Sequence, residues 1–385
     1  METQVGIVGA GPAGLLLAHL LGREGIESVV LEARTRDYVE NRVRAGVLEH
    51  GTVEVLKATG VGERLEREGM LHHGVELRFG GVGHRVDFSA LAGGRAITVY
   101  GQQEVVKDLI AARLEAGGKI LFEAEVESVD PEHGVIRFGD EELRCDFIAG
   151  CDGFHGVCRQ AVAERLQIYE RVYPFAWLGI LARAAPSSEE LIYTHSDRGF
   201  ALHSMRSPEV TRNYLQVPPE ESADDWPDER IWEELQTRMA TADGEFRLSE
   251  GEIFEKGVTP MRSFVAEPMR HGKMFLAGDA AHIVPPTGAK GLNLAVADIR
   301  VLARGLREWF ASGDGTRLDE YSDRCLQRVW RVQHFSWWMT SMLHRATGDA
   351  FESKLQRSQL DYVIRSQAAA TTLAENYVGL DLEDV

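Results

Sequence analysis

The sequence has few cysteines, no long hydrophobic run and no excess of positive charge. Its 4 cysteines form no Cys-x-x-Cys pair, which argues against a disulfide framework or a metal cluster and favours the reduced thiols of a cytoplasmic protein. Residues 335–339, an apolar stretch late in the chain, fall far short of the roughly 20 residues of a membrane-spanning helix, and no basic targeting segment precedes the first predicted strand. Lys+Arg 42 against Asp+Glu 60 gives a formal net charge of −18, so we expect neither nucleic acid nor an anionic membrane as a partner.

The chain is long enough for two or three domains, and it is rich in glycine. At about 150 residues per domain, 385 residues also allow a large hydrophobic core. Glycine occupies 39 positions, about 10% against a usual ~7%. Such a content indicates many tight turns or places where a ligand approaches the backbone closely.

A glycine-rich turn near the start of the chain has the spacing of a dinucleotide-binding motif. A short apolar strand is predicted at residues 4–8, followed by Gly-x-Gly-x-x-Gly and a leucine-rich helix. Gly9 makes the tight turn, Gly11 lets a pyrophosphate approach the backbone, and Gly14 allows the helix and the strand to pack closely. The helix N-terminus adds hydrogen-bond donors and positive potential.

An acidic residue follows the next predicted strand. Glu32 ends the apolar run 28–31, 18 residues after Gly14, where a carboxylate can accept hydrogen bonds from a ribose diol. A plain strand-turn-helix unit could carry the same glycines, and this motif alone does not separate FAD from NAD.

Two further predicted strands end in acidic residues, Asp152 after residues 145–151 and Asp279 after residues 274–277. Ligands of an open α/β sheet bind beyond the carboxyl ends of its strands, so we expect both loops to converge on the ligand of the glycine turn.

A helix is predicted from about residue 291 to just before Gly313. Its N-terminus, near Leu292 and Asn293, could stabilise the negative charge of a reduced flavin.

The middle of the chain alternates between apolar and polar residues and predicts a mixed or antiparallel sheet. A period of two places Ser204 and Arg206 on one face of a strand, Arg212 and Tyr214 on one face of the next, and Tyr193 on a third strand. If these faces coincide, they form an apolar wall for a flat aromatic acid, with Arg206 on its carboxylate. The pattern equally allows a solvated strand face with an ordinary surface arginine.

With these motifs the sequence resembles the class A flavoprotein aromatic monooxygenases. The glycine motif is common to many flavoproteins, whereas the stretches 285–293 and 375–377 are far narrower signals. The resemblance covers nearly the whole chain, through residues 9–12, 42–49, 99–102, 149–156, 262–265, 278–293, 335–340 and 374–380.

The resemblance implies a mixed α/β (α+β) fold, in which a Rossmann-like FAD-binding domain carries an inserted mixed β-sheet substrate domain and a C-terminal helical region. We expect the FAD-binding domain to be discontinuous and the substrate domain to be inserted into it. The expected ranges are 1–72, 97–172 and 273–330 for the FAD-binding domain, 73–96 and 173–272 for the substrate-binding sheet domain, and 331–385 for the helical region.

The implied reaction is FAD-dependent hydroxylation of 4-hydroxybenzoate to 3,4-dihydroxybenzoate (protocatechuate) with O2 and NAD(P)H, through a flavin C4a-hydroperoxide. The resemblance also implies a homodimer. Three alternatives remain open: the same chemistry on another aromatic acid, such as 4-aminobenzoate or a 3-hydroxybenzoate; an uncoupled flavin reductase or oxidase; and a non-catalytic FAD-binding interaction protein.

The resemblance implies roles for individual residues. Ser204, Arg206 and Tyr214 match the binders of the substrate carboxylate. Tyr193 matches the tyrosine that binds the substrate phenol, Tyr377 the tyrosine behind it, and the Pro286 carbonyl a further contact on the phenol side. His72 matches the solvent end of a proton relay, and Arg212 a residue that affects flavin position and reduction. Besides the glycines of the turn, the positions implied to contact FAD are Ala13, Glu32, Arg42, Arg44, Val47, Gln102, Asp279, Leu292 and Asn293.

The residues for the nicotinamide cosubstrate are implied less directly. Arg44, His155 and Arg262 match its contacts. Many members of the family place an arginine directly after the ribose-binding acid, where it holds the 2′-phosphate of NADPH, but here Ala33 follows Glu32. We therefore expect NADH to be accepted or preferred, with Arg34 as a further candidate for binding the nucleotide.

Overall fold

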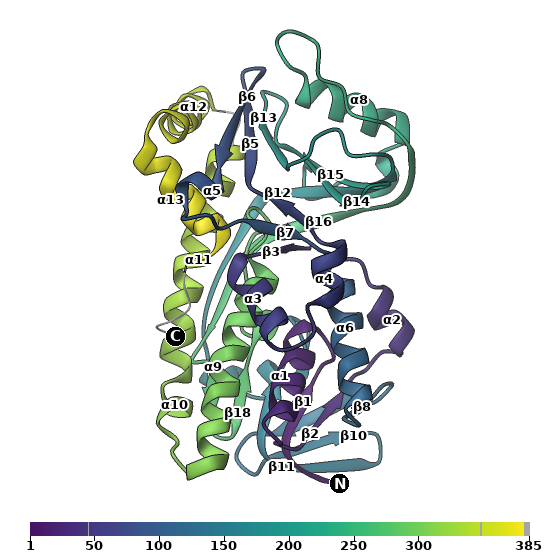
Figure 1. Ribbon diagram of the computed structural model, residues 1–385, viewed down its shortest axis with the longest axis vertical. Coiled ribbons are helices and arrows are strands. Elements are labelled where there is room, and N and C mark those ends of the chain that lie inside the picture. Colours follow the sequence, from purple (N-terminus) through teal and green to yellow (C-terminus); the bar gives the residue numbers. More distant parts are fainter. Residues whose placement is uncertain (45, 347–348, 381–385) are drawn as a thin grey trace.

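The computed structural model describes residues 1–44, 46–346 and 349–380 and has the mixed α/β architecture that the sequence predicts (Figure 1). Two large sheets lie one above the other in Figure 1, with helices packed around the lower sheet and the C-terminal helices along one side. Within the expected helical region 331–385, residues 347–348 and 381–385 lie outside the described residues. The domain boundaries themselves remain a prediction.

The first sheet has the strand order β17-β18-β11-β1-β2-β8, and β10 and β9 extend it from β11. β1 is parallel to both β2 and β11, so the chain leaves β1 toward one neighbour and returns later on the other side. Ligands of open α/β sheets bind at such a reversal of strand order. The bounds are β1 (Glu2–Val8), β2 (Ser28–Leu31), β8 (Lys119–Leu121), β9 (Val126–Asp130), β10 (Val135–Phe138), β11 (Glu141–Gly150), β17 (Arg270–His271) and β18 (Met274–Leu276).

Three of the helices that pack with this sheet around one hydrophobic core are long, and Ile7, Leu15 and Ile299 are fully buried in this core. These three helices are α1 (Pro12–Arg23), α6 (Gln102–Glu115) and α9 (Gly291–Ser312), and α1 contacts both of the others. The helix predicted before Gly313 is α9, which ends where Gly313 adopts a left-handed conformation with φ +79°.

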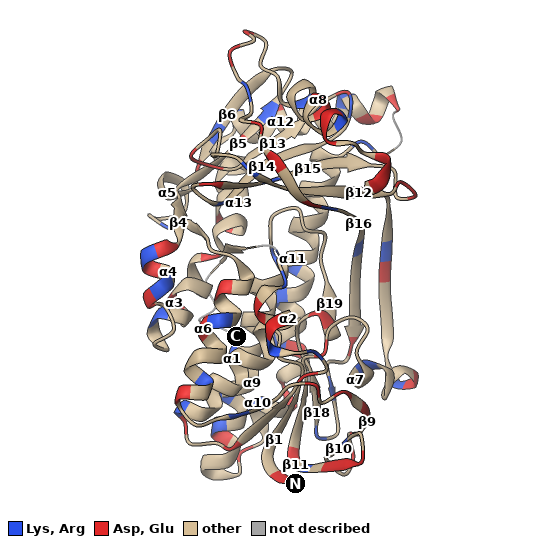
Figure 2. Ribbon diagram, turned by 90° about the vertical axis from the view of Figure 1, so that its right-hand side faces the viewer, with Lys and Arg blue, Asp and Glu red and all other residues tan. Residues whose placement is uncertain are grey.

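The second sheet has the order β19-β16-β12-β15-β14-β13-β5-β6. It is mixed, because β13 is parallel to β5 while the other pairs are antiparallel. The long strands β12 and β16 run from the first sheet to the second (Figure 2). The bounds are β5 (Gly74–Phe79), β6 (Val82–Asp87), β12 (Gln167–Arg183), β13 (Ile192–His195), β14 (Ala201–Ser207), β15 (Val210–Val217), β16 (Glu252–Glu267) and β19 (His282–Ile283).

The register of the second sheet places the polar side chains of three strands on one face. Tyr193 lies opposite Leu202, Leu202 opposite Tyr214, and Ser204 opposite Arg212. Directly opposed residues of paired strands share a face. The other face packs on α8 (Asp228–Met239) in a separate hydrophobic cluster.

The C-terminal helices are α11 (Tyr321–Leu343), α12 (Ala350–Arg365) and α13 (Gln367–Val378). Phe335 of α11 and Tyr377 of α13 belong to the same hydrophobic cluster as Tyr193, so these helices close the polar face of the second sheet. Among the described residues, no helix is both long and apolar enough to cross a lipid bilayer.

Short elements complete the chain. A three-stranded sheet has the order β3-β7-β4. The remaining bounds are β3 (Val47–Leu48), β4 (Met70–His72), β7 (Ile97–Val99), α2 (Arg36–Asn41), α3 (His50–Ala58), α4 (Glu63–Glu68), α5 (Phe88–Leu91), α7 (Val157–Gln160), α10 (Thr316–Asp319), η1 (Ala163–Arg165), η2 (Ala223–Asp225) and η3 (Gly278–Ala280).

Candidate active site

The glycine turn forms an open cradle at the end of β1. Gly9 has φ +103°, and a side-chain carbon there would collide with the backbone carbonyl of Cys151. A side-chain carbon at Gly14 would collide with the carbonyl of Gly9, whereas one at Gly11 would have no protein atom within 4 Å. No side chain caps the N-terminus of α1. The turn therefore packs tightly on the protein side and leaves space and free N–H groups for an anion on the other.

Glu32 is held beside this cradle. Its Oε2 accepts a hydrogen bond from the backbone N–H of Ala10 at 2.8 Å, and its Oε1 accepts one from the N–H of Arg34 at 2.9 Å. Carboxylate oxygens have further lone pairs, so both can accept hydrogen bonds from a ribose as well.

Charged side chains from separate segments meet in the same hollow. Burial lowers the pKa of Arg44, with Arg42 and Arg212 acting in the same direction and Asp279 opposing them. Burial likewise raises the pKa of Asp279, against the influence of Arg44. Arg44 and Asp279 are nevertheless accessible to solvent. Side chains that are surrounded by protein and still accessible line a hollow rather than a core.

Two arginines on the polar face of the second sheet have unpaired buried donors. Nε and Nη1 of Arg212 have no hydrogen-bond partner, and neither has Nε of Arg206. Burial lowers the pKa of Arg206 to about 10, which leaves it charged at neutral pH. Ser204 donates its hydroxyl to the Arg212 carbonyl at 2.8 Å. Buried guanidinium donors without partners indicate a site for an anionic group.

Asn293 ties the N-terminus of α9 to neighbouring segments. Asn293 donates to the carbonyls of Val47 and Ala289 at 3.0 and 2.9 Å and accepts from the Glu49 N–H at 2.9 Å. No side chain caps α9, and a side-chain carbon at Gly291 would meet no protein atom within 4 Å. This helix end is thus a second open donor site.

Tyr193 and Tyr377 are in direct contact. Their hydroxyl oxygens are 2.5 Å apart, and both side chains are buried. Burial raises the pKa of Tyr193 to about 12 and also raises that of Tyr377 well above its usual value, so both remain protonated at neutral pH. Tyr193 and Tyr377 are 184 residues apart in the sequence, and the fold brings them together.

His72, predicted at the solvent end of a proton relay, is buried, and the predicted contact Pro286 has a hydrogen bond within its own loop. His72 is only 2% exposed, its Nδ1 has no hydrogen-bond partner, and burial lowers its pKa to about 4. The accessible histidine is its neighbour His73, which bonds Ser89 at 2.7 Å. The Pro286 carbonyl accepts the N–H of Ala289 at 2.9 Å within its own loop.

The predicted nicotinamide residues lie in separate places. The guanidinium group of Arg34 lies over the Tyr38 ring, 5.6 Å from its centroid, and that of the predicted FAD contact Arg42 lies over the same ring at 5.7 Å. The His155 ring and the Arg262 guanidinium both contact Phe154. Gln102 is the first residue of α6, Ala13 lies in the first turn of α1, and Leu292 is the second residue of α9.

A buried charge cluster beside the site is absent from the sequence prediction. Glu49 accepts from Lys290 at 2.7 Å and from Arg328 at 2.8 Å. Lys290 also donates to the carbonyls of Asn376 and Tyr377 at 2.5 and 2.9 Å. The only sequence signal was the presence of charged residues inside the motif segments 42–49 and 278–293.

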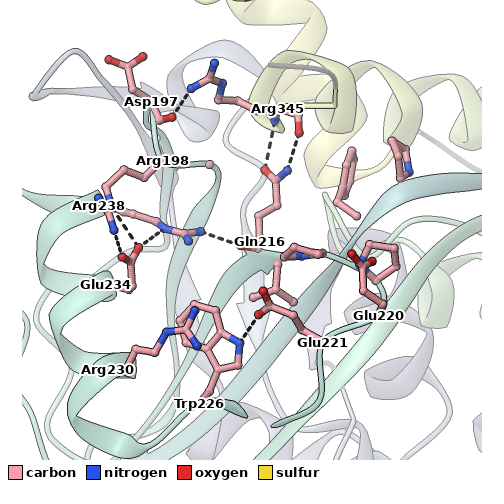
Figure 3. A pocket seen from close by; sticks show the side chains of 16 residues that line it. Asp197, Arg198, Gln216, Glu220, Glu221, Trp226, Arg230, Glu234, Arg238 and Arg345 are labelled. Atoms are coloured by element: carbon pink, nitrogen blue, oxygen red, sulfur yellow. Dashed lines mark hydrogen bonds and ion pairs between the residues drawn. The ribbon is translucent and has the colours of Figure 1, made fainter. Parts of the chain in front are cut away.

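A separate cleft of about 800 Å³ lies between the second sheet, α8 and the end of α11 (Figure 3). Its arginines are engaged within the protein: Arg198 and Arg238 with Glu234, and Arg230 with the Trp226 ring. None of the predicted site residues lines it.

The arrangement fits a dinucleotide that extends from the glycine turn to the N-terminus of α9, and a small aromatic acid against the second sheet. The open cradle at Gly11, the uncapped helix N-termini and the carboxylate of Glu32 fit the dinucleotide. The unpaired Nε–H donor of Arg206 and the tyrosine pair fit an acid with a polar group at its far end.

Comparisons with known proteins identify related sequences. Residues 2–336 match the family described as FAD binding domain. The chain is 49% identical over its full length to p-hydroxybenzoate hydroxylase of Acinetobacter baylyi, covering 96% of that protein. It is 28% identical to the probable NADH-specific resorcinol 4-hydroxylase of Rhodococcus jostii, over 82% of this chain and 61% of that protein.

A solved structure shares the fold over nearly the full length. p-Nitrophenol 4-monooxygenase PnpA of Pseudomonas putida superposes with a TM-score of 0.83 at 20% identity, over 99% of both chains.

Two alanine variants of the glycine turn test whether it binds FAD. Gly14→Ala forces a side chain into the Gly9 carbonyl, and we expect it to destabilise the apoprotein by about 3 kcal/mol. Gly11→Ala changes the stability of the apoprotein by less than about 1 kcal/mol but weakens FAD binding at least tenfold, because its methyl group enters the cradle. Urea unfolding of the apoprotein and titration with FAD measure both effects. Wild-type FAD affinity in Gly11→Ala would contradict the assignment.

Proposed function

Because the chain belongs to the class A flavoprotein aromatic monooxygenases, of the p-hydroxybenzoate hydroxylase type, we propose that it hydroxylates 4-hydroxybenzoate to 3,4-dihydroxybenzoate with FAD, O2 and a reduced nicotinamide. The observation that carries the choice of substrate is the polar face of the second sheet. It offers the unpaired Nε–H donor of Arg206 to a carboxylate and the Tyr193–Tyr377 pair to a phenol.

For the substrate we propose that Arg206, Ser204 and Tyr214 bind the carboxylate and so orient the ring. Arginine and carboxylate form two parallel charge-assisted hydrogen bonds, which fix direction as well as position. Tyr193 and the Pro286 carbonyl contact the phenol oxygen at the other end. These contacts hold the carbon ortho to the phenol toward the flavin.

Activation of the ring depends on loss of the phenol proton. A phenol ionises near pH 10 in water, and its neutral form is a weak nucleophile toward an electrophilic oxygen. Tyr193 accepts that proton while its own proton passes to Tyr377 and then toward His72. Because the pKa of Tyr193 is raised to about 12, the tyrosine transmits the proton rather than remaining ionised. The burial of His72 means that the last step needs an opening to solvent.

The residues of the glycine turn and of the α9 N-terminus would hold FAD, which when bound would pass electrons from the nicotinamide to O2. Arg212 would affect the position and the reduction of the flavin. The proposed FAD contacts are Gly9, Gly11, Ala13, Gly14, Glu32, Arg42, Arg44, Val47, Gln102, Asp279, Leu292 and Asn293.

For the nicotinamide cosubstrate we propose Arg34, Arg44, His155 and Arg262, with NADH accepted or preferred. The reason is that Ala33 stands where an arginine would hold a 2′-phosphate. Arg34 and Arg42 beside Tyr38 are the competing feature, since both cations could hold that phosphate. We also propose a cytoplasmic location, consistent with four free, buried cysteines.

The first test is turnover. With 4-hydroxybenzoate we expect the holoenzyme to consume NADH and O2 many times faster than without it, and 3,4-dihydroxybenzoate to appear in equal amount. The same assay with NADPH gives the ratio of kcat/KM values, for which we expect a preference for NADH or no preference. Stimulated consumption that yields only hydrogen peroxide would indicate another aromatic acid, and no stimulation would indicate a reductase or a non-catalytic protein.

The tyrosine pair gives a second prediction. Tyr193→Phe removes the hydroxyl that receives the phenol proton, so we expect the Kd of 4-hydroxybenzoate to change less than about tenfold while product formation falls about 100-fold. The ratio of product to NADH consumed should collapse. Tyr173→Phe is the matched control, because Tyr173 is also buried but bonds Ser263 instead. Normal product yield in Tyr193→Phe would rule the relay out.

We propose a homodimer formed through α12. On this helix Phe351, Leu355 and Tyr362 are 70%, 57% and 57% exposed and lie on one face. The helix carries three basic and two acidic side chains and is therefore close to neutral, so at this place two copies of an otherwise acidic chain repel each other least.

The interface can be tested by charge insertion. We expect the wild type to sediment as a dimer and the variant Phe351→Glu/Leu355→Glu as a monomer, because the change would bury carboxylates in an apolar contact. Val172→Glu, at a position that is 65% exposed on β12, should remain dimeric. A monomeric wild type, or a dimeric double variant, would contradict the proposal.

A further inference from the structure

The C-terminal end of α11 packs against the ends of β13 and β15 in the second sheet through its last carbonyl groups. His195 bonds the Leu343 carbonyl at 3.1 Å, and Gln216 donates to the Arg345 carbonyl at 2.6 Å (Figure 3). Gln356 of α12 donates to the His344 carbonyl at 2.5 Å. Carbonyl groups that a helix end leaves without partners are thus satisfied by side chains of other segments.

At the centre of this junction, the hydrogen bonds of His344 fix its tautomer. The Nδ1 atom lies 3.0 Å from the Thr340 carbonyl, which can only accept, so Nδ1 carries the proton. The Nε2 atom lies 2.6 Å from the indole Nε1 of Trp177, which can only donate, so Nε2 presents its lone pair. Both contacts require a neutral imidazole, and burial lowers the pKa of His344 to about 3, in agreement.

The imidazole also lies within an aromatic stack. Its centroid is 4.2 Å from that of Phe200 and 4.8 Å from that of Phe175. Trp177 in turn contacts Tyr214 with ring centroids 4.7 Å apart. A phenylalanine could fill the same volume and stack equally well, so packing alone does not require a histidine here. What the histidine adds is one directed acceptor for the indole N–H.

We propose that His344 is a positioning residue for the substrate carboxylate: it fixes the Trp177 indole, which holds Tyr214 in the orientation that binds the acid. The proposal rests on the proposed function, since it takes Tyr214 as a carboxylate binder. The same turn of α11 reaches the loop on the phenol side, because the Thr340 hydroxyl donates to Thr287 at 3.0 Å. One helix turn therefore sets the distance between the two ends of the substrate.

The test is a double-mutant cycle on the holoenzyme, read as the Kd of 4-hydroxybenzoate from flavin fluorescence. His344→Phe keeps the ring and removes the acceptor, while Trp177→Phe keeps a ring and removes the donor. We expect each to raise the Kd about tenfold, because each leaves one buried polar atom unpaired. The double variant should also be about tenfold weaker, rather than the hundredfold of independent effects.

His344→Gln supplies a conservative rescue, since its amide oxygen can reach the position of Nε2, and we expect a Kd within about threefold of wild type. The KM for NADH should stay unchanged in all variants. If His344→Phe lowers the Tm but leaves the Kd unchanged, or if the two single effects multiply, the positioning role is wrong.

The wild type is titrated first with 4-hydroxybenzoate, 4-aminobenzoate and 3-hydroxybenzoate. If the protein binds 4-aminobenzoate or 3-hydroxybenzoate but not 4-hydroxybenzoate, the proposed substrate is overturned. The double-mutant cycle is then measured with the acid that binds. Binding of none of them overturns both proposals.

Discussion

The buried carboxylate of Glu49 is the contact on which the geometry of the site most depends. It is shared between Lys290, at the start of α9, and Arg328 of α11, and all three side chains are at most 5% exposed. Lys290 extends the link to the backbone of Asn376 and Tyr377. Removal of one partner from such a cluster leaves a buried charge without compensation, which costs about 3–5 kcal/mol. A single carboxylate thus holds segments from the start, the late middle and the end of the chain around one cavity.

This link explains why the site lies between two sheets rather than within one of them. The glycine turn and the α9 N-terminus are fixed by the first sheet, and the polar wall by the second. The long strands β12 and β16 connect the two sheets. Helix α11 connects them from the other side, because its Tyr321 donates to the Leu276 carbonyl of β18 while its last turn bonds Thr287 and the following His344 accepts from Trp177 of the second sheet. The distance between flavin and substrate is therefore set by packing at both sides of the cavity.

Local features of this arrangement could be predicted from the sequence. The conformations of the glycine turn, of the residue after β2 and of the start of α9 are each determined by a few neighbouring residues. The shared face of Ser204 and Arg206 follows from the period of a strand. Whether Arg212 and Tyr193 lie on this same face depends on strand register, which the sequence pattern left open. The pairing of β13, β14 and β15 shows that they do. Contacts such as Tyr193 with Tyr377 join residues 184 positions apart, and for that pair only the family resemblance gave a signal. No local pattern indicated the burial of His72, the cluster around Glu49 or the bond from Trp177 to His344, because each arises from several elements packing together.

The exposed arginines near Tyr38 have a consequence for the kinetics of encounter. A chain with a net charge of −18 repels a dianionic nucleotide at long range, whereas the proposed nicotinamide contacts Arg34 and Arg44, together with Arg42, would attract it at short range. Added salt screens the long-range repulsion first, because the Debye length is about 10 Å at 0.1 M ionic strength and shortens further above it. The association rate of the nicotinamide should then rise with moderate salt and fall once the local attraction is screened as well, so the rate passes through a maximum. The acidic surface and the basic cavity entrance together make ionic strength a determinant of how fast this enzyme is reduced.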